Sequence, residues 1–167
     1  QYGVFFVVYP LMLLSLVPVF NRHVARPFVF SAAVNCVEMV LIVGYLSQWP
    51  VIMTLVVFGL YVLRFRFMSQ GPLFLLGSMG VVCQSTMLNF MSYPTSNWHT
   101  LMFSNMEACV MAVALSALLN YFIPDVEPRK PPPRIEKDAA RIRHESLLSG
   151  SVATMIFVIF QVCDLSD

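Results

Sequence analysis

Residues 28–63 read FVFSAAVNCVEMVLIVGYLSQWPVIMTLVVFGLYVL, a stretch of 36 residues in which Glu38 is the only charged side chain. One α-helix of this length would measure about 54 Å, which exceeds the roughly 30 Å hydrocarbon core of a bilayer. The sequence Ser47-Gln48-Trp49-Pro50 near the middle offers a turn, with a Trp suited to the headgroup level and a Pro suited to a helix N-terminus. The stretch therefore predicts two membrane-spanning helices, over 28–46 and 50–63.

The rest of the chain has the same apolar character. Hydrophobic residues make up 58% of its 167 residues and charged residues 11%, against roughly 25% charged in soluble domains. The formal net charge of +1 gives no reason to expect nucleic acid as a partner. We therefore predict an all-α, polytopic transmembrane helical bundle in the lipid bilayer, with about six spans over residues 3–20, 28–46, 50–63, 72–92, 101–123 and 147–163.

The basic residues predict the orientation of these spans. All ten fall after the first, third or fifth span, and none falls in the other connections: Arg22, Arg26, Arg64, Arg66, Arg129, Lys130, Arg134, Lys137, Arg141 and Arg143. The positive-inside rule assigns these segments to the cytoplasm, including the linker 124–146, and places Gln1 outside. Arg64 directly follows the short third span, so we expect it to extend toward the inner membrane interface.

The linker 124–146 combines two kinds of sequence. Its prolines favour an extended first half, whereas residues from Ile135 onward favour a polar helix that continues into the sixth span. Arg141 and Glu145 have the i,i+4 spacing of a helical ion pair. The linker is interpreted either as a solvated hinge or as a docking surface for another domain or for anionic lipid.

Two carboxyl groups inside predicted spans, Glu38 and Glu107, are candidate proton-coupling residues. A lone carboxyl in a low-dielectric environment favours its neutral form, which a gating group of a proton-coupled carrier requires. The alternative is a protonated carboxyl that only stabilises helix packing, and Glu107 fits it better because it lies nearer the interface. Arg64 and Arg66 could attract an anion at the inner mouth or could simply anchor the topology. Further candidates for a pathway are amides that must avoid lipid: Asn35, Gln84, Asn89 and Asn105.

Motifs of catalysis and metal binding are missing from the sequence. There is no G-x-x-x-x-G-K-[ST], H-E-x-x-H or G-x-S-x-G sequence, and the three histidines lie in separate connecting segments. The four cysteines, Cys36, Cys83, Cys109 and Cys163, form no C-x-x-C pair. We therefore expect no catalytic residue, no metal site, no cofactor and no enzymatic activity.

The segment RHESLLSGSVAT at 143–154, with FQVCDL at 160–165, resembles the start of the second half of bacterial fusaric acid resistance proteins and aromatic acid exporters (the FUSC-like superfamily). Within that superfamily the chain is most similar to a bacterial branch of unestablished function. The resemblance implies that 1–123 is part of a first half-repeat and 147–167 the first helix of a second, so that the chain is a piece of a longer protein. It also implies an inner-membrane efflux component that works with a periplasmic membrane-fusion adaptor.

We accordingly expect a transport protein of the bacterial inner membrane, a proton-coupled efflux component for small organic or aromatic acids that could form homo-oligomers. Proton coupling is expected because the chain carries no nucleotide-binding motif. An anion channel is one alternative, because plant anion channels activated by aluminium are thought to share the architecture. A membrane scaffold that recruits a partner through the linker 124–146 is another.

Overall fold

The structure is a computed structural model that describes residues 3–16, 20, 22–70, 73–91, 97–123 and 138–163. These residues form α-helices joined by short connections, and no strand occurs among them. The predicted all-α class is therefore confirmed. The helices are α1 (Val4–Leu16), α2 (Arg22–Leu41), its π-helical continuation η1 (Ile42–Leu46), α3 (Pro50–Ser69), α4 (Phe74–Met91), α5 (Trp98–Phe122) and α6 (Ala139–Val162).

Five of these elements are long and apolar enough to cross a membrane: α2 together with η1, α3, α4, α5 and α6. Many of their large apolar side chains are exposed, as expected for helices that face lipid. The shorter α1 has 13 residues and spans only about 20 Å. Of the first span predicted over 3–20, residues 17–19 lie outside the described residues. The chain is thus a multi-pass helical membrane protein.

The turn that splits the long apolar stretch is present where the sequence predicts it. η1 ends at Leu46, α3 begins at Pro50, and the Trp49 amide donates to the Leu46 carbonyl over 2.9 Å. The third span was predicted too short, because α3 continues past Leu63 to Ser69. This continuation keeps Arg64 inside the bundle, where it finds polar partners on neighbouring helices.

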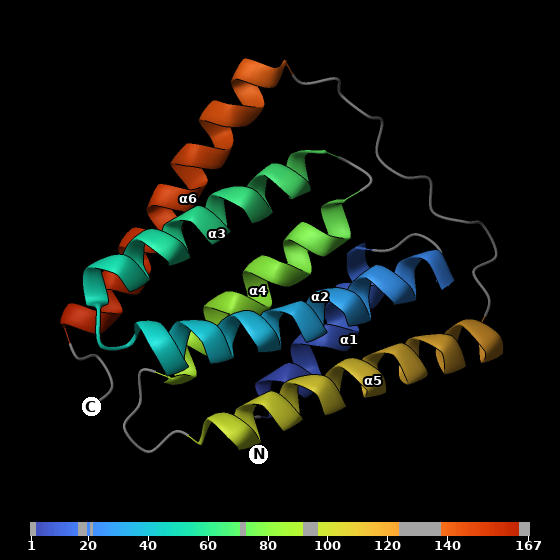
Figure 1. Cartoon of the computed structure of the whole chain (residues 1–167). Helices are drawn as coiled ribbons and strands as arrows, with labels where there is room; N and C mark the ends of the chain where they lie inside the picture. Colours follow the sequence, from blue (N-terminus) through green and yellow to red (C-terminus); the bar gives the residue numbers. More distant parts are fainter. Residues whose placement is uncertain are drawn as a thin grey trace.

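Consecutive helices run in alternating directions (Figure 1). The C-terminal ends of α1, α3 and α5 therefore lie at the same end of the molecule as the N-terminal ends of α2, α4 and α6. We call this the basic end, because the basic residues of the described part all lie in the helix halves nearest to it: Arg22, Arg26, Arg64, Arg66, Arg141 and Arg143. The other four basic residues lie outside the described residues. The helices thus alternate in direction, as the distribution of basic residues predicts.

Two glycines allow close contact between spans. A Cβ at Gly77 of α4 would lie 2.5 Å from the Arg64 carbonyl oxygen of α3, and a Cβ at Gly150 of α6 would lie 2.6 Å from Val62 Cγ2 of α3. Small residues at such positions let membrane helices approach each other closely. α3 therefore packs between α4 and α6, while α2 packs against α4 and α5, and α1 packs against α5.

α6 joins the polar end of the linker to the last apolar segment in one helix. It begins at Ala139 and ends at Val162, so the polar segment and the predicted sixth span are continuous. Arg141 Nε donates to Glu145 Oε1 over 2.9 Å, which confirms the i,i+4 ion pair predicted from the sequence. The proline-rich residues 124–137 lie outside the described part of the chain.

Candidate functional site

A part-buried ion pair and a buried hydrogen bond connect three helices near the basic half of the bundle. Arg64 of α3 forms a hydrogen-bonded ion pair with the Glu38 carboxylate of α2, and its Nε donates to Gln84 Oε1 of α4 over 3.0 Å. The side chain of Arg64 is 7% exposed and that of Glu38 is 23% exposed. We call these three residues the ion-pair cluster.

Gly80 of α4 provides the space for this cluster. A Cβ at Gly80 would overlap the Arg64 guanidinium, so the arginine occupies the volume that a side chain would fill. Gln84 lies one helical turn further along α4, on the same face, and presents its amide oxygen to the arginine. The small and polar positions of α4 thus form a recess for a buried cation.

The helix directions explain how Glu38 and Arg64 meet. Side chains on an α-helix lean toward its N-terminus. α2 and α3 are antiparallel and joined at the turn around Trp49, so Arg64 leans toward that turn and Glu38 leans away from it. The two side chains therefore reach the same level along the axis of the bundle. The negative charge of Glu38 and the positive charge of Arg64 then compensate each other, which an apolar interior requires of both groups.

This arrangement differs from the environment expected for Glu38 and Arg64. Glu38 has no basic residue in its own helix, but α3 supplies one. Arg64 was expected to extend toward the inner interface, but it is buried, because its interior partners compensate its charge and Gly80 leaves room for it. Arg66, two residues further along, is exposed on α3 near the basic end.

Gln84 retains an unused donor. Its residue is fully buried, and its Nε2 has no hydrogen-bond partner among the described residues. A buried amide nitrogen without a partner carries a desolvation penalty of about 1–3 kcal/mol. The cluster could thus provide a hydrogen bond, in addition to the Arg64 guanidinium, to an acceptor that enters it.

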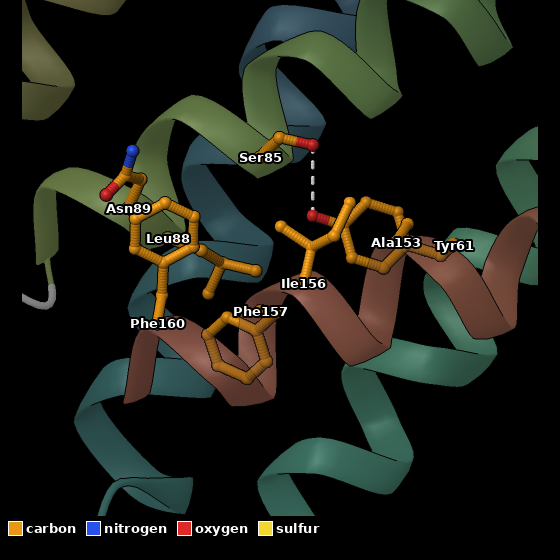
Figure 2. A pocket seen from close by; sticks show the side chains of 8 residues that line it. All are labelled: Tyr61, Ser85, Leu88, Asn89, Ala153, Ile156, Phe157 and Phe160. Carbon is orange, nitrogen blue, oxygen red and sulfur yellow. Dashed lines mark hydrogen bonds between the residues drawn. The ribbon is translucent and has the colours of Figure 1, made fainter. Parts of the chain in front are cut away.

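A cavity of about 280 Å³ lies next to the ion-pair cluster, between α3, α4 and α6. Figure 2 shows the rings of Tyr61, Phe157 and Phe160 around it and the Tyr61 hydroxyl directed at Ser85 Oγ, 3.0 Å away. We call this cavity the aromatic pocket; its other lining residues are Leu88, Asn89, Ala153 and Ile156. Tyr61 lies one turn before Arg64 on α3, and Ser85 follows Gln84 on α4. The pocket and the cluster therefore share two helices.

A second cluster of polar side chains surrounds Asn105 of α5. Its Oδ1 accepts hydrogen bonds from the Tyr9 hydroxyl and from Cys83 Sγ, and its Nδ2 contacts Cys36 Sγ at 3.1 Å. These contacts tie α5 to α1, α4 and α2, and every group in them is satisfied without a formal charge. The arrangement is typical of a packing contact between membrane helices. Among the described residues no group of three or more His, Cys, Asp or Glu could hold a metal ion.

The remaining candidate residues lie apart from one another. Glu107 is exposed on α5, between Phe103 and Met111 on the same outer face. Asn35 is buried one turn before Glu38 and donates to the Ser31 carbonyl over 2.7 Å, while its Oδ1 has no partner among the described residues. Asn89 lines the aromatic pocket. The structure therefore brings together Glu38, Arg64 and Gln84, with Asn35 and Asn89 close by in sequence.

Sequence reasoning placed Gly80 and Ser85 among the small and polar positions of the fourth span, but it missed Tyr61 and the aromatic residues of α6. One signal was available: Tyr61 precedes Arg64 by three residues, so both lie on one face of α3. The contribution of Phe157 and Phe160 depends on the packing of α6 against α3 and α4, which no spacing in the sequence specifies.

A bundle of apolar helices with a compensated charge pair in its interior defines a polytopic membrane protein. Residues 1–119 match the model of the family described as Protein of unknown function (DUF2955). This match covers more than half of the chain, so the chain belongs to that family. No curated protein and no solved structure matches it. The segment 143–165, on which the resemblance to fusaric acid resistance proteins rests, lies outside the matched residues, and what that resemblance implies belongs to the proposal below.

Proposed function

We propose that this protein transports small organic anions and that Glu38 and Arg64 couple anion binding to proton binding. The observation that carries the proposal is the Glu38–Arg64 ion pair, which is largely buried on the arginine side and lies between apolar helices beside the aromatic pocket. Buried ion pairs contribute little net stability, because desolvation offsets their attraction. Ionisable residues inside membrane spans commonly mark substrate or proton pathways. A functional role therefore accounts for this pair better than stabilisation does.

The chemistry of the pair suggests how the coupling works. A guanidinium binds carboxylates through paired hydrogen bonds, so a substrate carboxylate and the Glu38 carboxylate compete for Arg64. Protonation of Glu38 removes its negative charge and frees Arg64 for the substrate. Proton and anion then bind together, and by linkage each raises the affinity for the other. The unused Gln84 Nε2 provides a further donor to the bound anion.

The aromatic pocket supports an aromatic substrate. Its volume of about 280 Å³ exceeds that of an apolar cavity of about 150 Å³ that holds benzene. A ring could lie among Tyr61, Phe157 and Phe160 while its carboxylate reaches toward Arg64 on the same face of α3. Edge and offset contacts between aromatic rings are favourable by about 0.5–1.5 kcal/mol each. Small aromatic acids are therefore the proposed substrate class.

The setting of the transporter is also part of the proposal. The resemblance to fusaric acid resistance proteins implies export across a bacterial inner membrane with a periplasmic membrane-fusion adaptor, whereas binding of proton and anion together is symport, which an inward proton gradient drives toward uptake. The direction of benzoate flux under an imposed pH gradient distinguishes the two. The basic residues at one end of the bundle support an orientation with that end, and the linker 124–146, in the cytoplasm.

Flux measurements in proteoliposomes test the coupling. Benzoate, the simplest aromatic carboxylate, serves as the probe, and its flux is measured against pH for the wild-type chain, Glu38→Gln and the matched control Glu107→Gln. We expect Glu38→Gln to lose the pH dependence and Glu107→Gln to retain it, because only Glu38 contacts a cation. Equal insertion of all three proteins controls for folding. Unchanged pH-dependent flux in Glu38→Gln would reject the proposal.

The same assay separates the alternatives. An anion channel would give benzoate or chloride conductance that does not depend on the pH gradient. A scaffold would give no flux at all, and deletion of 131–134 would abolish its assembly with a partner while leaving insertion intact.

A further inference from the structure

A second cavity, of about 470 Å³, opens between α3 and α6 at the basic end. We call it the α3/α6 cleft. Its polar lining consists of Arg66 and Gln70 of α3 with Arg143 and Ser146 of α6, and its apolar lining includes Val62 and Leu147. The proposed transport site does not use it, since the aromatic pocket is lined by other residues.

The packing of α6 explains why the cleft exists. The contact between Gly150 and Val62 brings the two helices so close that a Cβ at Gly150 would meet Val62. From that contact toward the N-terminus of α6 the helices separate, and Figure 1 shows α6 diverging from the end of α3. The polar residues of the cleft lie on this diverging part. The cleft is therefore a consequence of helix geometry, with its cations at the mouth.

Ser146 is an independent sign of a missing ligand. The residue is 2% exposed, and its Oγ has no hydrogen-bond partner among the described residues. Neighbouring hydroxyls on α6 behave differently, because Ser151 donates to the Leu147 carbonyl and Thr154 to the Gly150 carbonyl, each over 2.8 Å. Buried polar groups are normally paired, so an unpaired hydroxyl on a residue that lines the cleft indicates an absent acceptor.

The charges of the cleft specify an anion. Among the described residues, neither Arg66 nor Arg143 forms an ion pair, and the lining contains no acidic residue. The nearest carboxylate in sequence, Glu145, is bound to Arg141. Guanidinium groups form paired, charge-assisted hydrogen bonds with phosphate oxygens, and a serine hydroxyl or a glutamine amide can add to them. The four polar side chains together suit a phosphate group.

We infer that the α3/α6 cleft binds the phosphate headgroup of an anionic phospholipid. The cleft lies between two candidate membrane spans, and its cations lie at the end where basic residues gather. The adjoining Leu63 and Leu148 are exposed and apolar, so they can contact the acyl chains of a lipid whose phosphate lies in the cleft. Basic pockets between membrane helices on the cytoplasmic side bind such headgroups.

Native mass spectrometry of the purified chain in detergent tests this inference. Phosphatidylglycerol is compared with zwitterionic phosphatidylcholine, and soluble glycerol 1-phosphate is the third ligand. The variants are Arg66→Gln with Arg143→Gln, and Ser146→Ala, with Arg22→Gln and Arg26→Gln together as the control that removes two exposed charges from the basic end outside the cleft. We expect the double substitution to weaken phosphatidylglycerol binding about tenfold or more, and the control to leave it unchanged.

Ser146→Ala keeps the test decisive if the double variant fails to fold, because it changes no charge and removes a single hydroxyl. We expect it to weaken phosphatidylglycerol binding several-fold and to leave phosphatidylcholine binding unchanged. Equal binding of the two lipids, or an equal loss in the control with Arg22→Gln and Arg26→Gln, would overturn the inference. Binding of glycerol 1-phosphate with the same dependence on Arg66 and Arg143 would overturn the assignment to a lipid and indicate a site for soluble phosphate esters.

Discussion

Gly80→Ala tests whether the ion-pair cluster depends on a position without a side chain. The added methyl group would overlap the Arg64 guanidinium and displace it from Glu38 and Gln84, without changing any charge. Removing one partner of a buried ion pair costs about 3–5 kcal/mol, and this is the upper limit here because the flexible end of Arg64 is displaced while both charges remain. Alanine gains about 1 kcal/mol over glycine from helix propensity. The net expected destabilisation is therefore at most about 2–4 kcal/mol.

Gly59→Ala is the matched control, because Gly59 lies on α3 and an added Cβ would meet nothing within 4 Å. We expect this variant to be unchanged or more stable by up to about 1 kcal/mol. Reversible unfolding in mixed micelles, followed by circular dichroism, measures both variants. In an Arg64→Leu background, Gly80→Ala should lose most of its effect, since the overlapping group is gone. Equal stability of Gly80→Ala and Gly59→Ala would refute the described position of Arg64.

Two further predictions concern topology and helix ends. Cys163→Ser first removes the exposed thiol of the described residues. In this background, Arg22→Cys and Arg143→Cys should react with a membrane-impermeant maleimide from one face of the membrane, and Gln48→Cys from the other. Labelling of Arg22→Cys and Arg143→Cys from opposite faces would disprove the alternating arrangement. Asn97→Ala should destabilise the start of α5 by about 1 kcal/mol, because the Asn97 side chain accepts from the His99 and Thr100 amides; the same unfolding assay measures it, and an unchanged midpoint would contradict the cap.

The spans could be predicted from the sequence because hydrocarbon imposes a length and excludes charge. The length limit requires residues 28–63 to be split, the turn residues at Trp49-Pro50 place the split, and the structure confirms it. The predicted ends of the spans were less accurate where a local contact extends a helix. α5 begins at Trp98 rather than at 101 because Asn97 caps it, and the compensated charge of Arg64 lets α3 continue inside the bundle past Leu63.

The candidate site could be predicted only in part. Glu38 and Gln84 were singled out correctly as polar groups that should avoid lipid, and both face the interior cluster. Their connection through Arg64 could not be derived, because the pairing depends on which helices are neighbours and on the empty position at Gly80. Glu107 met the same sequence criterion as Glu38 but lies on an exposed face, and periodicity alone does not distinguish the two.

Proton uptake on substrate binding tests the proposed coupling most directly. Benzoate is titrated calorimetrically into the purified chain at several pH values, in buffers of different ionisation enthalpy. The competition for Arg64 predicts uptake of up to one proton per benzoate bound by the wild-type chain and none by Glu38→Gln. Benzoate binding without proton uptake, or with the same uptake in Glu38→Gln, would contradict the coupling of the two charges.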